Sequence, residues 1–363
     1  MSSSRFFLFS CFVTSCISAA ALAADQPWVN ISDLLIAKLT ADGKKPVWPG
    51  ETAGIAVDRT TGNLFLVVPG DGLFKSTDRG ATFTRCDGGK VTGRCETAFA
   101  LNLDPASSRI ACFMLDGKCG MSLDGGQTWQ AFKDVGRNWD YAAVDWTVEK
   151  PQVIFGARHE SGGESHVSAD AGASWTMLAK EKAFDAQGAV GVVDANTFLT
   201  TKGQGLHRST DQGKSWTKVS DFTPISHVMQ TFNGVHYFFA INPADPAAPA
   251  DPKKKKPATY ESFLIVSKDK GQTWNKQGAM TDAAWGPYFG KDEKHLITVG
   301  KKSVIVESTD AGESWKEVVA LPPKGFDTNR AGWFTNLAYD PKSDTFYISR
   351  MGQPAFKYER KQP

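Results

Sequence analysis

The chain has 363 residues, and its 41 Lys and Arg nearly balance its 39 Asp and Glu, which leaves a net charge of +2. This balance excludes a nucleic-acid-binding protein that depends on bulk positive potential. Apolar residues make up 41% of the chain and charged residues 22%, a composition that excludes a largely disordered protein. The 34 Gly, 11 Trp and 23 Phe favour many short strands joined by tight turns.

Residues 1–23 are predicted to be a secretory signal peptide. Met1–Arg5 is short and positively charged, an apolar stretch follows, and the sequence ALA at 21–23 fits a cleavage site. A second interpretation stays open, because Val13–Cys16 resembles a bacterial lipoprotein box in which Cys16 would carry a lipid anchor. Either interpretation predicts an exported protein, periplasmic or secreted. No other segment is long and apolar enough to form a transmembrane span.

An eight-residue pattern with the consensus Ser-x-Asp-x-Gly-x-Thr/Ser-Trp recurs six times, with Phe83 replacing Trp in the first copy. The Asp side chain can accept hydrogen bonds from backbone N–H groups in a tight turn, and the Gly permits a positive φ. The Trp then begins the returning strand and packs between sheets. We therefore predict a structural role for the six repeat aspartates, which are Asp78, Asp124, Asp170, Asp211, Asp269 and Asp310.

Each copy of this eight-residue repeat follows two further strand-like runs. In the first unit these runs are Ala53–Asp58 and Asn63–Val68, and the strand Leu73–Ser76 leads into the repeat. Each unit is thus expected to hold about four short strands, with the repeat between the third and the fourth. Four-stranded units of this period are the blades of a β-propeller.

The number of blades follows from the segment after the sixth repeat. Residues 333–358 have the layout of another blade, but the repeat and a fourth strand are missing. The apolar segment Trp28–Leu39 precedes the first blade and has no partner, so we predict that it supplies the missing outer strand and closes the ring. The expected fold is an all-β, seven-bladed β-propeller that forms one domain over residues 24–363.

A Pro- and Lys-rich insertion, residues 243–259, interrupts the spacing of the repeats. Its prolines and four consecutive lysines predict an extended, solvated loop. Two interpretations stay open: a surface loop without a function of its own, or a contact for an anionic partner.

The eight-residue pattern is identified as the Asp box, or BNR repeat. On these six motifs the chain resembles the Asp-box β-propeller superfamily, which includes sialidases, sortilin-type receptors, xyloglucan-cleaving hydrolases and photosystem II assembly factors. The resemblance covers nearly the whole mature chain and implies the propeller fold. In that superfamily the Asp boxes lie at blade edges, away from the ligand site.

The catalytic features of the enzymes in this superfamily are missing. The sialidases open with a Phe-Arg-Ile-Pro-like segment before the first box, whereas the only Arg of the mature chain in that region is Arg59, in a polar turn. Sialidases also need an arginine trio, a Tyr nucleophile with a Glu partner and an Asp acid/base. Xyloglucan-cleaving relatives place two acids across a cleft between two propellers, and this chain has one propeller.

Propeller ligands usually bind at the mouth, the face formed by the loops that lead into the first strand of each blade and by the loops that join the second strand to the third. Seven aromatic and basic residues are predicted to bind ligand there: Trp139, Trp285, Trp333, Arg137, Arg158, Arg330 and Arg350. Tryptophan faces suit sugar rings, and converging guanidinium groups can grip a carboxylate or sulfate. The alternatives are that the tryptophans plug the ring and that each arginine pairs with a nearby acid.

Three acids at the predicted mouth are candidates for catalysis. A paired-carboxylate mechanism requires two acids about 5–10 Å apart, one of them with a raised pKa. The best candidate pair is Asp140 with either Glu160 or Glu96. No metal-binding spacing, phosphate-binding loop or nucleophile elbow is present, so no metal and no cofactor are expected.

Four cysteines remain after removal of the signal peptide, and an even number in an exported chain favours disulfides. Cys86 and Cys95 bracket a short Gly-rich loop, and Cys112 and Cys119 bracket a hairpin with an Asp-Gly turn. We predict the two local disulfides, Cys86–Cys95 and Cys112–Cys119.

Complete repeats beside missing catalytic motifs predict a non-catalytic, exported binding or scaffold protein. Its partner would be a glycan or a protein, bound at the mouth by a monomer, and no nucleic acid is expected. The alternative is a divergent glycoside hydrolase, sialidase-like or xyloglucanase-like, with its active site at the same mouth.

Overall fold

The computed structural model describes residues 28–45, 47–134, 139–150, 152–161, 163–180, 188–202, 204–242, 261–278, 283–300, 302–322, 326 and 335–360. The predicted signal peptide, Cys16 and the insertion at 243–259 lie outside these residues. None of the helices in the described part has the length and apolar character needed to cross a membrane.

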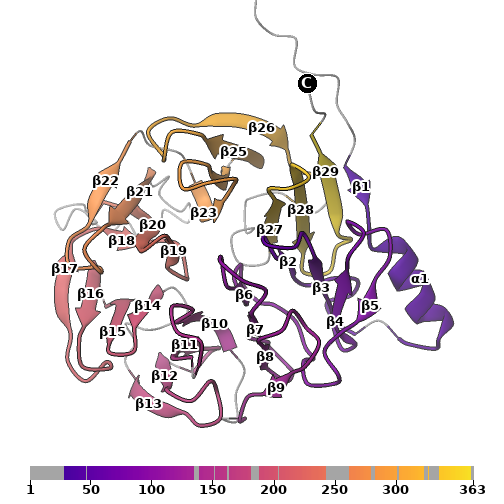
Figure 1. Ribbon diagram of the computed structural model, residues 1–363, viewed down its shortest axis with the longest axis horizontal. Coiled ribbons are helices and arrows are strands. Elements are labelled where there is room, and N and C mark those ends of the chain that lie inside the picture. The colour runs from indigo at the N-terminus through magenta and orange to yellow at the C-terminus, as the bar shows by residue number, and fades with distance from the viewer. Residues whose placement is uncertain are drawn as a thin grey trace, which may run out of the picture.

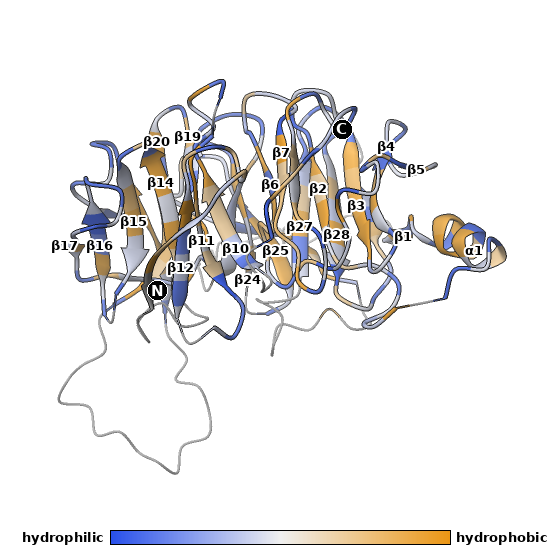
Figure 2. Cartoon of the chain, turned by 90° about the horizontal axis from the view of Figure 1, so that it is seen from below, coloured by the Kyte–Doolittle hydropathy of each residue, from blue (hydrophilic) through white to orange (hydrophobic). Residues whose placement is uncertain are grey.

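Seven antiparallel sheets stand around a central channel, and each forms one blade (Figure 1). The sheets have four strands each except the fifth, in which an additional short strand pairs with β20. This arrangement confirms the predicted seven-bladed, all-β architecture. Figure 2 shows the ring from the side, with apolar residues concentrated along the strands.

The first three blades are formed by β2 (Ile55–Val57), β3 (Leu64–Val68), β4 (Gly72–Ser76) and β5 (Thr84–Arg85); by β6 (Leu101–Leu103), β7 (Ile110–Cys112), β8 (Gly120–Ser122) and β9 (Gln130–Ala131); and by β10 (Trp139–Val144), β11 (Ile154–Arg158), β12 (Glu164–Ser168) and β13 (Thr176–Lys180).

Blades four to six are formed by β14 (Val190–Asp194), β15 (Thr197–Thr201), β16 (Leu206–Ser209) and β17 (Thr217–Ser220); by β18 (Thr223–Pro224), β19 (Gln230–Phe232), β20 (Val235–Ile241), β21 (Ser262–Ser267) and β22 (Asn275–Gln277); and by β23 (Ala283–Phe289), β24 (Leu296–Gly300), β25 (Val304–Ser308) and β26 (Lys316–Ala320). The seventh consists of β27 (Thr335–Asp340), β28 (Thr345–Arg350), β29 (Phe356–Glu359) and β1 (Val29–Asn30).

The core lies between the blades, because each sheet buries both of its faces against its neighbours. The strand β3 is buried along its whole length, whereas both residues of the outermost strand β5 are exposed. Phe155 of blade three stacks on Phe198 of blade four with ring centroids 5.2 Å apart. Apolar contacts of this kind recur between neighbouring blades and join the sheets.

The eight-residue repeats form one recurring turn between the third and fourth strands of a blade. In the first copy, Asp78 Oδ1 accepts hydrogen bonds from the Thr82 N–H at 2.9 Å and from the Ser76 hydroxyl at 2.7 Å. The Ser76 hydroxyl oxygen accepts the Gly80 N–H at 2.8 Å, and Gly80 has a φ of 83°. The same side-chain contacts occur at Asp124, Asp170, Asp211, Asp269 and Asp310.

A second recurring turn, which the sequence analysis did not single out, lies between the first and second strands. Asp58 Oδ1 accepts the Thr60 N–H at 2.8 Å, and equivalent contacts are made by Asp104, Asp145, Asp194 and Asp340. In blade six the repeat turn bonds to this turn, since the Ala311 N–H donates to the Lys294 carbonyl at 2.9 Å. Both turns therefore lie on one side of the ring, which we call the repeat face. The mouth is the other side.

The N-terminal segment differs from the expected long strand. Only β1 pairs with β29, with Val29 opposite Lys357, and the chain then forms the helix α1 (Asp33–Ala41) outside the ring (Figure 1). The sequence of α1 is rich in good helix formers, and the Asn30 side chain caps its start by accepting the N–H groups of Ser32 and Asp33. The prediction of a strand as far as Leu39 was therefore wrong.

Neither predicted disulfide is present, because Cys86, Cys95, Cys112 and Cys119 all have free thiols. Cys112 is directly opposite Gly120, so Cys119 is one residue out of register with it. Successive residues of a strand point to opposite faces, and the two thiols therefore do not face each other.

The other predicted disulfide, Cys86–Cys95, fails for a different reason. The Cys86 N–H bonds to the Leu73 carbonyl on the outer half of blade one, whereas the Cys95 N–H bonds to the Ala53 carbonyl beside the inner strand. The loop between the two cysteines crosses from the outer to the inner side of the blade. Burial raises the pKa of the Cys86 thiol to about 12, so this thiol stays protonated.

Candidate functional site

The loops at the mouth of blades one to three bring several charged side chains together. The backbone of Arg94 pairs with that of Leu115 through two hydrogen bonds of 2.9 and 3.0 Å. The Thr97 hydroxyl donates to the Asp140 carbonyl at 2.7 Å, which ties the loop before blade two to the first strand of blade three. These backbone contacts set the positions of the side chains between Arg94 and Asp140.

Asp140 and Glu96, two of the predicted catalytic acids, lie in this group. Asp140 is only 1% exposed, and its Oδ1 is 2.7 Å from His159 Nδ1. The Glu96 carboxylate is 3.4 Å from Arg94 Nε. Burial raises the pKa of Glu96 above its usual range; nearby Arg94 and His159 oppose the rise, and the charge of Asp140 adds to it. The structure thus gathers Glu96, Asp140 and His159 in one cluster.

Glu160, the third candidate acid, lies at the edge of this cluster. Its side chain is 79% exposed, and its Oε1 is 3.8 Å from His159 Nε2. A carboxylate this exposed is surrounded by water, unlike the buried Asp140. Of the two pairs proposed from the sequence, Asp140 with Glu96 is the better supported by the geometry.

An exposed tryptophan, Trp48, completes the cluster, and the sequence analysis did not assign it to the site. Trp48 is 66% exposed, and its ring covers the Arg94 guanidinium at 4.4 Å from the ring centroid. Arg94 is itself held by ion pairs with Glu96 and Asp116. A Trp immediately before the first blade was the available signal. We call Trp48, Arg94, Glu96, Asp140 and His159 the mouth patch.

The predicted aromatic platforms are buried. Trp139 and Trp285 are 3% and 2% exposed, so neither ring can stack on a sugar. The Trp139 ring packs against Trp175 at 4.5 Å and against Phe113 at 6.2 Å. Trp139 and Trp285 therefore fill space between blades, whereas the alternative in the sequence analysis was that the tryptophans plug the ring. Trp333 lies outside the described residues.

The predicted arginines do not form one cluster in the described structure. Arg158 is 5% exposed on blade three, and its Nη1 is 4.0 Å from Glu164 Oε2. Arg350 ends β28 in blade seven, opposite Thr335. Arg137 and Arg330 lie outside the described residues. Arg94, which the sequence analysis did not name, is the arginine of the mouth patch.

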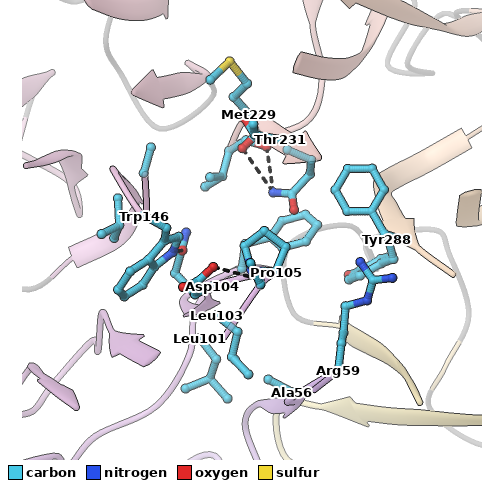
Figure 3. Close-up of a pocket in the computed structure, with 18 of the residues that line it drawn as sticks. Ala56, Arg59, Leu101, Leu103, Asp104, Pro105, Trp146, Met229, Thr231 and Tyr288 are labelled. Carbon is cyan, nitrogen blue, oxygen red and sulfur yellow. Dashed lines mark hydrogen bonds between the residues drawn. The ribbon is translucent and has the colours of Figure 1, made fainter. Parts of the chain in front are cut away.

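The central channel is closed partway along its length. Phe99 of blade two and Tyr288 of blade six stack with their ring centroids 4.8 Å apart. On the repeat side of this pair lies a cavity of about 360 Å³, lined by the inner strands and by Arg59, Asp104 and Trp146 (Figure 3). Of the predicted site residues that the structure describes, none lines this cavity, because the sequence analysis placed the ligand at the mouth.

The described residues contain no group of three or more His, Cys, Asp and Glu side chains arranged to hold a metal ion. The mouth patch contains ion pairs and one exposed aromatic face.

No known protein family matches the sequence, and no curated protein is detectably similar. The fold defines a seven-bladed β-propeller, and solved propellers are similar to it. One is a GH74 enzyme from Niastella koreensis, 14% identical with a TM-score of 0.53 over 84% of this chain and 52% of its own. The present chain thus spans about half the length of that enzyme.

Two further solved structures show how diverse such propellers are. An oligogalacturonate lyase in complex with manganese is 11% identical, with a TM-score of 0.56 over 84% of this chain and 87% of its own. A chain of the mitotic checkpoint complex is 7% identical, with a TM-score of 0.53 over 100% of this chain and 99% of its own. Identities this low show the fold alone, and the fold occurs in both enzymes and protein assemblies.

Proposed function

We propose that this chain is a non-catalytic binding or scaffold protein that presents the mouth patch to a protein or glycan partner. The observation that carries the proposal is Trp48, which is 66% exposed and stacked on Arg94. Trp and Arg are the residue types that dominate binding energy at interfaces. Because Glu96 and Asp116 hold Arg94 in place, little conformational entropy is lost when a partner covers Trp48.

The state of the acids supports binding rather than catalysis. Asp140 is buried and paired with His159, and Glu96 is paired with Arg94. A glycosidase needs one acid free to protonate the leaving oxygen and a second free to attack or to activate water. Carboxylates already engaged by basic side chains instead give the mouth a fixed pattern of charge, which sets specificity for a partner.

The proposal keeps the organisation expected from the sequence. The N-terminal segment directs export, either as a signal peptide over residues 1–23 or as a lipoprotein leader that is cleaved before Cys16, which then carries the lipid. Residues 24–363 form one monomeric Asp-box propeller, and the pairing of β1 with β29 supports closure of the ring by the N-terminal segment. The six repeat turns support assignment to the Asp-box superfamily.

The test compares three forms of residues 24–363 on a glycan array and on an array of extracellular and envelope proteins. We expect saturable binding by the wild type and binding about tenfold weaker or more by Trp48→Ala. Met177→Ala is the matched control, because Met177 is an apolar side chain, 55% exposed, on the outer strand of blade three. Equal binding by Trp48→Ala and the wild type would contradict the proposal.

One observation favours the second candidate, a divergent glycoside hydrolase: the raised pKa of Glu96 beside Asp140. Here Glu96 would be the general acid and Asp140 the second carboxylate. The wild type, Glu96→Gln and Asp140→Asn are assayed on a broad panel of glycosides. Turnover by the wild type that both substitutions abolish would establish the hydrolase activity and overturn the non-catalytic proposal. No turnover by the wild type would exclude the hydrolase.

A further inference from the structure

The channel cavity at the repeat face is separate from the mouth patch, since the stacked Phe99 and Tyr288 lie at its inner end. Its walls are mainly apolar strand residues, among them Ala56, Leu101, Leu103 and Met229 (Figure 3). Its volume of about 360 Å³ lies within the range of about 300–1,000 Å³ typical of small-molecule sites. Turn residues of the repeat face, such as Pro105 and Thr147, also line the cavity.

Arg59 is the one basic side chain with a permanent charge among the residues that line the cavity. Its Nη2 donates to the Gly290 carbonyl, and its guanidinium carbon is 4.9 Å from the centre of the Phe232 ring. Its Nε and Nη1 are buried without a hydrogen-bond partner, and no ion pair to it is formed within the described part of the chain. In Figure 3 the side chain extends toward Tyr288, across the cavity from Trp146.

The electrostatic setting of Arg59 is unusual for a cation. Burial lowers the pKa of its guanidinium, and Tyr339 and Asp292 oppose this only from a distance. A buried donor without a partner costs about 1–3 kcal/mol, and a charged donor costs more. An anion that reached Nε or Nη1 would reduce this cost through a charge-assisted hydrogen bond.

Two further lining residues have unpartnered polar atoms. Asn336, on the blade next to that of Arg59, is 2% exposed and its Nδ2 has no acceptor. Asp145, on blade three, uses Oδ1 to accept the Thr147 N–H at 2.9 Å, whereas its buried Oδ2 has no donor. Donors are thus unsatisfied on the side of blades one and seven, and an acceptor is unsatisfied on blade three.

We propose that this cavity binds a compact amphipathic carboxylate that also carries a hydroxyl or amino group. Its carboxylate bonds to Arg59 and Asn336, its apolar body lies against the strand walls, and its hydroxyl or amino group donates to Asp145. Each of these three side chains then gains a hydrogen-bond partner of the right type for one of its unpartnered atoms.

The test uses isothermal titration of residues 24–363 with 4-hydroxyphenylacetate, phenylacetate and the neutral 4-hydroxyphenylacetamide. We expect 4-hydroxyphenylacetate to bind about tenfold more tightly than its amide, because the amide has no charge for Arg59. The affinity for phenylacetate should lie between the affinities for these two compounds, since phenylacetate has the carboxylate but lacks the hydroxyl donor for Asp145. This comparison uses the wild type alone, so it does not depend on whether a variant folds.

Substitutions then locate the site. Arg59→Gln should weaken binding of both acids about tenfold, and Arg59→Lys, which keeps the charge, should restore part of it. Arg79→Gln is the matched control, because Arg79 lies in the first repeat turn with its side chain 57% exposed. Asp145→Asn should weaken the binding of 4-hydroxyphenylacetate but leave the affinity for phenylacetate unchanged.

Three outcomes would overturn the inference. The first is that the wild type binds neither acid at about 10 mM. The second is that it binds 4-hydroxyphenylacetate and the amide with equal affinity. The third is that Arg59→Gln binds the acids as tightly as the wild type does. If Asp145→Asn weakened the binding of both acids equally, Asp145 would not be the residue that accepts the hydroxyl group. Trp48→Ala should leave these titrations unchanged, so the result is independent of binding at the mouth.

Discussion

At the scale of single residues, the buried charge of Glu307 is compensated by basic groups from its own blade and from blade seven. Glu307 on β25 is 3% exposed, and Arg360 Nη1 lies 2.9 Å from its Oε2. His295 Nε2 and Lys316 Nζ also contact this carboxylate, at 3.2 and 3.1 Å. Because Arg360 follows the last strand of blade seven, the cluster joins the end of the described chain to blade six.

Glu307→Gln should lower the free energy of unfolding at pH 7 and should remove the part of that free energy that the wild type loses in acid. Burial alone would raise the pKa of Glu307, but His295, Arg360 and Lys316 lower it to about 2. A lowered folded-state pKa means that the contribution to stability is complete above about pH 4.5 and is lost as the pH falls toward 2. We expect a loss of about 2 kcal/mol at pH 7, less than for a fully buried pair because Lys316 is exposed.

Urea unfolding at pH 7 and pH 3 measures this effect. Glu317→Gln is the control, since the Glu317 side chain is 63% exposed and lies 4.0 Å from Lys302. This control should stay within about 1 kcal/mol of the wild type. A Glu307→Gln protein with the stability of the wild type at pH 7 would show that the cluster has no net effect.

At the scale of elements, the strand β1 and the helix α1 show how the ends of the chain meet. The Ile31 N–H donates to the Ala355 carbonyl at 2.9 Å, and the Ala355 N–H donates to the Ser32 hydroxyl at 3.0 Å. The Trp28 indole N–H donates to the Ala320 carbonyl of blade six at 2.8 Å. This short segment therefore contacts two blades, although its strand is only two residues long.

A variant that begins at residue 33 should be less stable and should self-associate. It loses the buried Ile31 and Ser32, which together contribute at least about 2 kcal/mol. It also leaves β29 as an unpaired edge, which promotes association between molecules. Thermal melting and size-exclusion chromatography at several protein concentrations measure both effects.

A variant that begins at residue 28 keeps β1 and serves as the control. It should match the melting temperature of the chain that begins at residue 24. If the variant that begins at residue 33 melted at the same temperature and remained monomeric, β1 would have no part in closing the ring.

At the scale of the whole molecule, the ring is stabilised by packing between blades rather than by the mouth or the channel. Trp139 at the mouth end of β10 is an example, because its ring contacts Phe113 of blade two, Trp175 and His166. Such contacts join neighbouring blades and bury the aromatic residues that a glycan site would need exposed.

Trp139→Ala should therefore destabilise the propeller by about 3–5 kcal/mol, as expected for removal of a buried aromatic side chain. Partner binding per folded molecule should be unchanged. Trp48→Ala provides the opposite pattern and is the matched control: weaker binding, with a stability change within about 0.5 kcal/mol. A stable Trp139→Ala protein that lost binding would restore Trp139 to the ligand site.

The sequence by itself determined the number of blades and the six repeat turns. The hydrogen bonds of each repeat turn join residues at most four positions apart, as from the Gly80 N–H to Ser76 and from the Thr82 N–H to Asp78, so a short motif contains the whole interaction. The order of the strands follows because consecutive antiparallel strands pair with their neighbours. Local chemistry of this kind is readable without a structure.

Only the tertiary structure decided which residues meet between blades. The contact of Trp48 with Arg94, the burial of Trp139 and the separation of Cys86 from Cys95 depend on how neighbouring sheets twist and pack. The direction of Arg59 was equally hidden, since its polar turn gives no sign that the side chain reaches Gly290 of blade six. Long-range packing sets these positions, because it brings together residues whose separation in the sequence carries no periodic signal.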